Sequence, residues 1–109
     1  MAAKGIFGKA KRKDRRRFLE IFSELEDWVA YLSHSSTKGR VVARSKAPHL
    51  QEFEKLVKQD IFSPRLQAKS IDLVRMLNEV EEKFDSPKEF HKAVVRAEAQ
   101  FKKAGKLVR

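Results

Sequence analysis

The amino-acid sequence predicts an all-α protein, a four-helix bundle-like single domain with a flexible basic N-terminal arm. Three observations indicate this fold class. Apolar residues recur at steps of three and four, the spacing of one helix face, along most of the chain. Two Ser-Pro pairs are typical of helix starts, and no segment has the alternating pattern and partner that a β-hairpin requires. Because 109 residues suit one domain, we expect residues 1–13 to form the arm and residues 14–109 the helical domain.

The first predicted helix runs from about residue 14 to residue 34. Its apolar face consists of Phe18, Ile21, Phe22, Leu25, Trp28, Val29 and Leu32. We expect Trp28 to pack in the core because it lies on this face, whereas Tyr31 lies off it. The rest of the surface carries the acidic residues Glu20, Glu24, Glu26 and Asp27. This acidic face is either ordinary helix surface or a docking face for a basic partner.

Three further helices are predicted downstream. A short one follows Pro48, a residue that suits the first helical turn. The stretch SPRLQ predicts a third helix, with Ser63 as the N-cap and a proline directly after it. The stretch SPKE predicts a fourth, with Ser86 as the N-cap and Glu89 completing a capping box. We expect Gly105 to end this last helix.

The charge of the chain is strongly positive and unevenly distributed. Its 25 Lys and Arg residues exceed its 15 Asp and Glu residues, which gives a net charge of +10 and a pI near 10.1. Residues 1–17 carry a net charge of +7, residues 18–37 carry −4, and residues 38–46 carry +4. This distribution favours a polyanionic partner, with nucleic acid before an anionic membrane surface.

We therefore expect a non-enzymatic protein that binds DNA or RNA, chiefly through phosphates, as an accessory or regulatory factor. Closely spaced Lys and Arg side chains neutralise phosphates and release counterions. The N-terminal arm and the basic loop at residues 38–46 are the predicted contact regions, with the C-terminal lysines as a further candidate. The loop belongs to a longer connection, residues 35–47, and connections of that length are typically functional or mobile. The candidate phosphate-binding residues are Lys9, Lys11, Arg12, Lys13, Arg15, Arg16, Arg17, Lys38, Arg40, Arg44 and Lys46.

The basic arm also admits other interpretations. RRRFLE, from Arg15 to Glu20, matches a twin-arginine export pattern, but the acidic residues that follow it and the missing cleavage site argue against a signal. Ile6 and Phe7 together form a weak membrane anchor, so peripheral membrane contact is the less favoured alternative. No apolar run is long enough to span a membrane. We expect a cytoplasmic location, or a nuclear one in a eukaryote, where KRKDRRR fits a localisation signal.

The alternative function is a helical protein-interaction adaptor. It would use the acidic helix face or an apolar groove, and the basic arm would serve for targeting or solubility. A homo-oligomer or another protein is then the expected partner. A helix-turn-helix that reads bases is less favoured, although Arg65, Gln67, Lys69 and Ser70 lie early in the third helix.

The sequence offers little for catalysis, and we expect no metal and no cofactor. The chain has no cysteine, and its histidines (His34, His49 and His91) lack partners at metal-ligand spacing. The spacing from Arg44 to His49 resembles the R-x4-H motif of helical HEPN-type ribonucleases, which would imply that these two residues act on a phosphodiester. Here the motif covers six residues and straddles a proline and a loop instead of leading a helix.

Overall fold

The computed structural model describes residues 2–34 and 46–108 of the chain. Within these ranges the chain forms five α-helices and no strand, which confirms the all-α bundle. Their bounds are α1 Ala2–Phe7, α2 Arg12–His34, α4 Leu50–Lys58, α5 Pro64–Glu82 and α6 Pro87–Val108. The first long helix thus begins two residues earlier than predicted. No helix in the described part of the chain is both long and apolar enough to cross a membrane.

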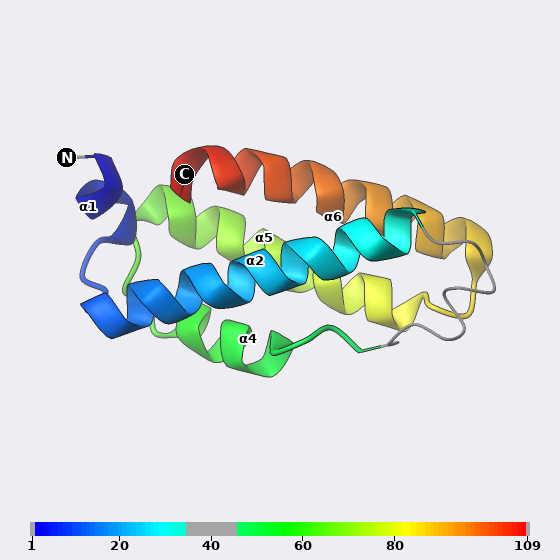
Figure 1. Cartoon of the computed structure of the whole chain (residues 1–109), viewed down its shortest axis with the longest axis horizontal. Helices are drawn as coiled ribbons and strands as arrows, with labels where there is room; N and C mark the ends of the chain where they lie inside the picture. The colour runs from blue at the N-terminus through cyan, green and yellow to red at the C-terminus, as the bar shows by residue number, and fades with distance from the viewer. Residues whose placement is uncertain (1, 35–45, 109) are drawn as a thin grey trace.

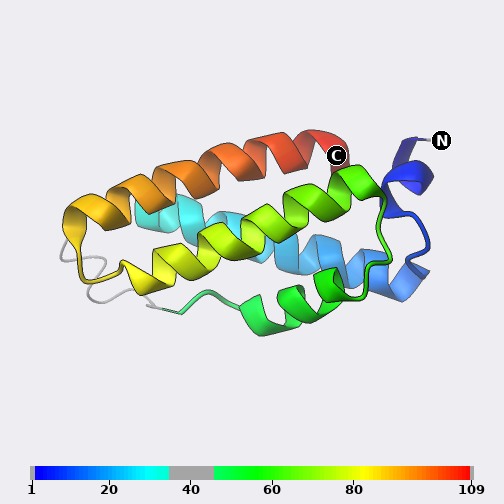
Figure 2. The same ribbon diagram turned by 180° about the vertical axis from the view of Figure 1, so that it is seen from behind.

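The long helices α2, α5 and α6 lie side by side and give the molecule its extent of 44 × 21 × 18 Å (Figure 1). The shorter α4 covers part of α2 and α5, as both views show (Figures 1 and 2). α1 lies at the end of the bundle where α6 finishes and α5 begins. This arrangement brings residues from distant parts of the sequence to one end of an elongated molecule.

The core is built from the apolar faces that the sequence pattern identified. Every predicted apolar residue of α2 is buried, including Trp28 at 7 % exposure. Phe18 is fully buried, and its ring contacts four others, those of Phe7, Phe22, Phe53 and Phe62. These rings come from α1, α2, α4 and the connection between α4 and α5. One buried side chain therefore joins most of the elements at that end of the bundle.

Two helices begin at the residues that the sequence predicted. The Oγ atom of Ser63 accepts a hydrogen bond from the Leu66 N–H at 3.4 Å, and α5 starts at the proline that follows, as predicted. α6 starts at Pro87, also as predicted. The prediction that Gly105 ends this helix is wrong, because α6 continues to Val108. Gly105 is buried within α6.

The N-terminal segment packs on the bundle, which differs from the expectation of a flexible arm. Phe7 is only 5 % exposed because its ring lies against the rings of Phe18 and Phe62, with centroids 6.2 and 6.3 Å away. The Lys9 N–H donates to the Ile61 carbonyl oxygen at 2.8 Å, and the Ser63 N–H donates to the Ile6 carbonyl oxygen at 2.9 Å. The cations that follow Phe7 are thus presented from a fixed backbone.

Gly8 makes this docking possible. Its φ is 56°, in the left-handed region that favours glycine. A Cβ atom at this position would lie 2.9 Å from the Ile61 carbonyl oxygen and 2.9 Å from the Phe62 carbonyl carbon, both of which are backbone atoms. Gly5, in contrast, has no atom within 4 Å of such a Cβ. The two glycines therefore provide a matched pair of variants.

We expect Gly8→Ala to lower the free energy of unfolding by about 1–3 kcal/mol, since it adds backbone strain and forces α1 away from residues 61 and 62. Gly5→Ala should leave the stability unchanged or raise it by up to about 1 kcal/mol, because alanine is the better helix former. Urea unfolding followed by circular dichroism measures both values. Equal stability of the two variants would contradict the docked arrangement.

Candidate nucleic-acid interface

Exposed cations gather at the end of the bundle where α1, the first turns of α2, the start of α5 and the last turns of α6 meet (Figures 1 and 2). We call this region the basic end. We define it by eight exposed cationic residues, Lys9, Lys11, Arg12, Lys13, Arg16, Arg65, Lys103 and Lys106. The acidic residues in the same segments are Asp14 and Asp60. The basic end is therefore a region of strong positive charge.

The cations of the basic end differ from several cations along the helices in having no acidic partner. In the body of the bundle, Lys58 pairs with Glu54 at 3.0 Å and Arg96 pairs with Glu79 at 2.5 Å. None of the eight side chains of the basic end forms an ion pair or a hydrogen bond with a residue in the described ranges. Unpaired like charges repel one another, and a bound polyanion relieves this repulsion.

Three of these eight residues were not among the predicted site residues. Arg65 belongs to α5, and Lys103 and Lys106 belong to α6. They join the N-terminal cations only because α1 packs against the start of α5 and the end of α6. The charge of the last predicted helix was visible in the sequence, but its position beside the N-terminal segment depends on the topology.

The structure separates Lys46 from the basic end. Lys46 is exposed, and the next residue, Ala47, donates its N–H to the Oε2 atom of Glu81 at 2.6 Å. Glu81 lies sixteen residues after Arg65 on α5, which corresponds to about 24 Å along the helix axis. The other predicted loop residues, Lys38, Arg40 and Arg44, lie outside the described residues. Lys46 therefore lies away from the N-terminal cations.

Arg17 and Arg15 differ from the exposed cations of the arm. Arg17 makes a two-pronged ion pair with Glu52 of α4, with Nε–Oε2 and Nη2–Oε1 distances of 2.6 and 2.7 Å. Its Nη1 also lies 3.5 Å from an oxygen of Glu20. Arg15 is half-buried, and its Nε atom is buried without a hydrogen-bond partner in the described part of the chain. Arg15 and Arg17 are therefore less accessible to a ligand than the exposed cations of the basic end.

The ion pair between Arg17 and Glu52 fixes α4 to α2. The hydrogen bonds from Arg17 hold the pKa of Glu52 below its ordinary value of 4.5, and the same hydrogen bonds raise the pKa of Arg17 above its usual value. The neighbouring His49 has its Nε2 atom 2.9 Å from Glu24 Oε2 and its Nδ1 atom 3.4 Å from Arg17 Nη2. A neutral ring with its hydrogen on Nε2 satisfies both contacts. His49 thus has a structural role between α2 and α4, and Arg44 of the R-x4-H motif lies outside the described residues.

The helix-turn-helix interpretation is weakened at two of its candidate base-reading residues. Gln67 donates its Nε2 hydrogen to the Val57 carbonyl oxygen at 2.5 Å, so it connects α5 to α4. Ser70 is fully buried. Of the four candidates, only Arg65 is fully exposed, and Lys69 is half-buried. The start of α5 therefore contributes positive charge, but it offers no row of exposed side chains for base reading.

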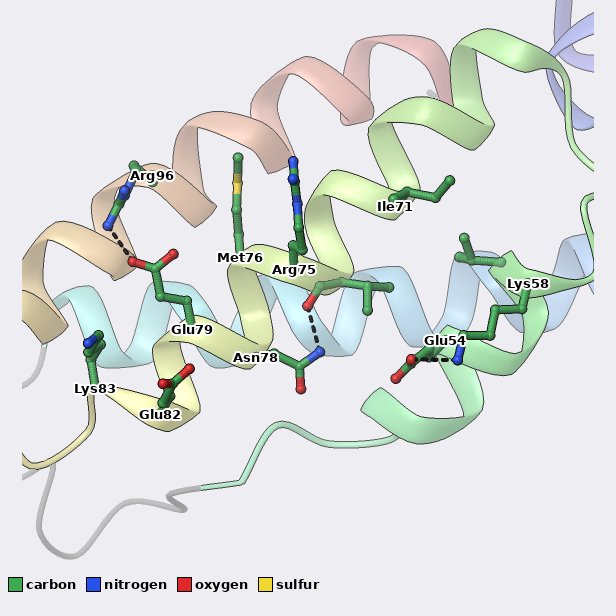
Figure 3. A pocket seen from close by; sticks show the side chains of 12 residues that line it. Glu54, Lys58, Ile71, Arg75, Met76, Asn78, Glu79, Glu82, Lys83 and Arg96 are labelled. Carbon is green, nitrogen blue, oxygen red and sulfur yellow. Dashed lines mark hydrogen bonds and ion pairs between the residues drawn. The ribbon is translucent and has the colours of Figure 1, made fainter.

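A groove of about 790 Å³ lies on another face of the molecule, between α4, α5 and α6 (Figure 3). Its apolar lining comes from Val57, Ile71, Val74 and Met76. Ile71 is 48 % exposed, which is high for a large apolar side chain. The charged side chains around the groove carry both signs, among them the pairs Lys58–Glu54 and Arg96–Glu79. The groove therefore has no concentration of positive charge that would favour a polyanion.

Comparisons with protein families, with curated proteins and with solved structures give no match to this chain. Its function is therefore inferred from the geometry and charge of the molecule.

The role of Glu52 can be tested through its pH dependence. A lowered folded-state pKa means that the carboxylate stabilises the fold above its ordinary pKa of 4.5, and that this contribution is lost as the pH falls through the folded-state value. Glu52→Gln should therefore lower the melting temperature at pH 7, and its difference from the wild type should shrink as the pH falls further below 4.5. Thermal unfolding between pH 3 and pH 7 measures this difference.

The control for this experiment is Glu54→Gln, which removes a pair with Lys58 inside α4 only. It should change the melting temperature little, because exposed pairs four residues apart in a helix stabilise weakly. A loss in Glu52→Gln that is equally large at pH 3 and at pH 7 would contradict the role of the Glu52 carboxylate.

Proposed function

We propose that this chain is a non-enzymatic nucleic-acid-binding protein that contacts phosphates through its basic end, as an accessory or regulatory factor. The observation that carries the proposal is a set of eight exposed cations that three separate parts of the chain bring to one end and that have no ion-pair partner within residues 2–34 and 46–108. Several cations elsewhere on the bundle have acidic partners within 4 Å. A cluster of cations without such partners is suited to a polyanion.

The mechanism is electrostatic capture. Phosphates displace the counterions of the Lys and Arg side chains, so the affinity should fall steeply with salt concentration. Because Phe7 and the Gly8 turn fix the N-terminal segment, the chain holds these cations in place before it binds. Less conformational entropy is then lost on binding than with a free tail.

The proposal is tested with a variant in which Lys9, Lys11, Arg12 and Lys13 are replaced by Gln. These residues are exposed, so the fold should survive, and circular dichroism checks this. For mixed-sequence duplex DNA, the slope of log affinity against log salt should become shallower by roughly 0.9 for each phosphate that is no longer neutralised, or about 3 to 4 in total. Fluorescence anisotropy at two or more salt concentrations measures the slope, and RNA is tested in parallel.

A charge-matched control replaces Arg75, Lys83, Lys88 and Lys92 by Gln. These residues lie in the second half of α5, between α5 and α6, and at the start of α6, away from the basic end. The control should retain a steeper salt slope than the basic-end variant. Equal slopes would mean that net charge alone attracts the polyanion, and no binding to DNA or RNA at low salt would reject the proposal. The predicted loop is tested separately by replacing Lys38, Arg40, Arg44 and Lys46.

A second candidate function is a protein-interaction adaptor, and the groove beside Ile71 favours it. The acidic face of α2 is a weaker candidate for docking, because Glu20 and Glu24 already contact Arg17 and His49 within the bundle. The substitution Ile71→Glu distinguishes the two functions, because it places a charge in the groove and leaves the cations of the basic end unchanged. This change should leave nucleic-acid affinity unaltered if the basic end is the functional surface.

A further inference from the structure

All ten aromatic residues of the chain lie within the described ranges, so their exposure can be compared completely. Seven of the eight phenylalanines are buried, and Phe84 is half-buried with its ring against that of Phe90. Trp28 is buried. Tyr31, at 53 % exposure, is the one exposed aromatic side chain of the protein. The molecule therefore offers few aromatic surfaces to any ligand.

The aromatic rings nearest the basic end are used inside the protein. Phe7 precedes the cationic residues of the α1–α2 turn, but its ring faces inward to Phe18 and Phe62. Phe62 is 6 % exposed, and its ring centroid lies 4.8 Å from that of Phe18. These rings have no open face on which a nucleic-acid base could stack.

Tyr31 lies far from the basic end. It follows Arg12 by nineteen residues on the same helix, which corresponds to about 28 Å along the axis. The helix between them carries the acidic residues Glu20, Glu24, Glu26 and Asp27, which repel phosphates. A strand held at the basic end does not therefore reach Tyr31 along α2.

The positions of the aromatic side chains bear on whether the basic end would bind single-stranded or double-stranded nucleic acid. Proteins that bind single strands without sequence preference combine a positive groove with aromatic side chains on which bases stack. The basic end has the cations without such aromatic side chains, so its binding depends on the density of phosphates. A duplex carries one charge per about 1.7 Å of its axis, and one strand carries one per about 3.4 Å. The bundle is 21 × 18 Å across, and a 21 Å length of duplex carries roughly twelve phosphates, whereas the same length of a single strand carries about six.

We propose that the basic end binds paired strands of nucleic acid through their phosphate backbones, in preference to single strands. This inference rests on the proposed function and names its substrate class. Duplex DNA and duplex RNA share the chemistry that the site would recognise, namely two phosphate backbones held at a fixed separation.

The test uses the full chain and three unlabelled competitors of equal length: duplex DNA, duplex RNA and an unstructured single strand of oligothymidine. Each displaces a fluorescent duplex at low salt. We expect at least one duplex to bind roughly five- to tenfold more tightly than the single strand, with a steeper salt slope. Equal or tighter binding of the single strand would overturn the inference while leaving the proposed function intact. No binding of any of the three would reject the proposed function itself.

Tyr31→Ala provides an independent measurement. The substitution should leave the affinity for the duplexes and for the single strand unchanged, because Tyr31 lies away from the cations. If base stacking on Tyr31 contributed, its removal would weaken single-strand binding by about 5- to 150-fold, and the inference would be wrong. Circular dichroism confirms that this exposed substitution leaves the fold intact.

Discussion

The contact of Phe18 with four other aromatic rings is the interaction on which the rest of the structure depends. It joins α2 to α1, to α4 and to the connection that leads into α5. Burial of five phenylalanine side chains in one cluster provides a large hydrophobic driving force. The cluster lies directly beside the N-terminal cations of the basic end, since Phe7 and Phe18 flank them in the sequence. The protein thus places a cluster of buried aromatic rings beside a surface of closely spaced like charges.

Charge is organised differently in the two parts of the molecule. Along the helices, several Arg and Lys side chains lie close to carboxylates, so their fields largely cancel beyond the Debye length of about 10 Å. At the basic end there is no such cancellation among the described residues, and the field extends into solvent. Among the described residues the positive charge is therefore least compensated at the basic end, and a field of this kind favours the approach of a polyanion to that end.

Much of the fold could be predicted because its signals are local. Helix periodicity identified the buried face of α2 residue by residue, and the Ser63 cap was identified from a serine followed by a proline. The docking of α1 could not be predicted, because a six-residue helix has no usable periodicity and its position depends on the left-handed Gly8 and the backbone at residues 61 and 62. The pairing of Arg17 with Glu52 joins residues 35 positions apart, and no short sequence pattern indicates it. The cations of α5 and α6 were visible as charges, but their meeting with α1 depends on topology.

The proposed function and the dimensions of the bundle together predict how much nucleic acid one molecule would cover. A bundle that stands with its 21 × 18 Å end on a duplex covers about six base pairs, at about 3.4 Å per pair. A bundle that lies along the duplex on its 44 Å side covers about thirteen. The number of base pairs per protein at saturation therefore reports the orientation of the bound molecule. In the upright orientation the groove beside Ile71 lies on the side of the bound molecule. On one duplex, the groove of each copy would then face the side of a neighbouring copy.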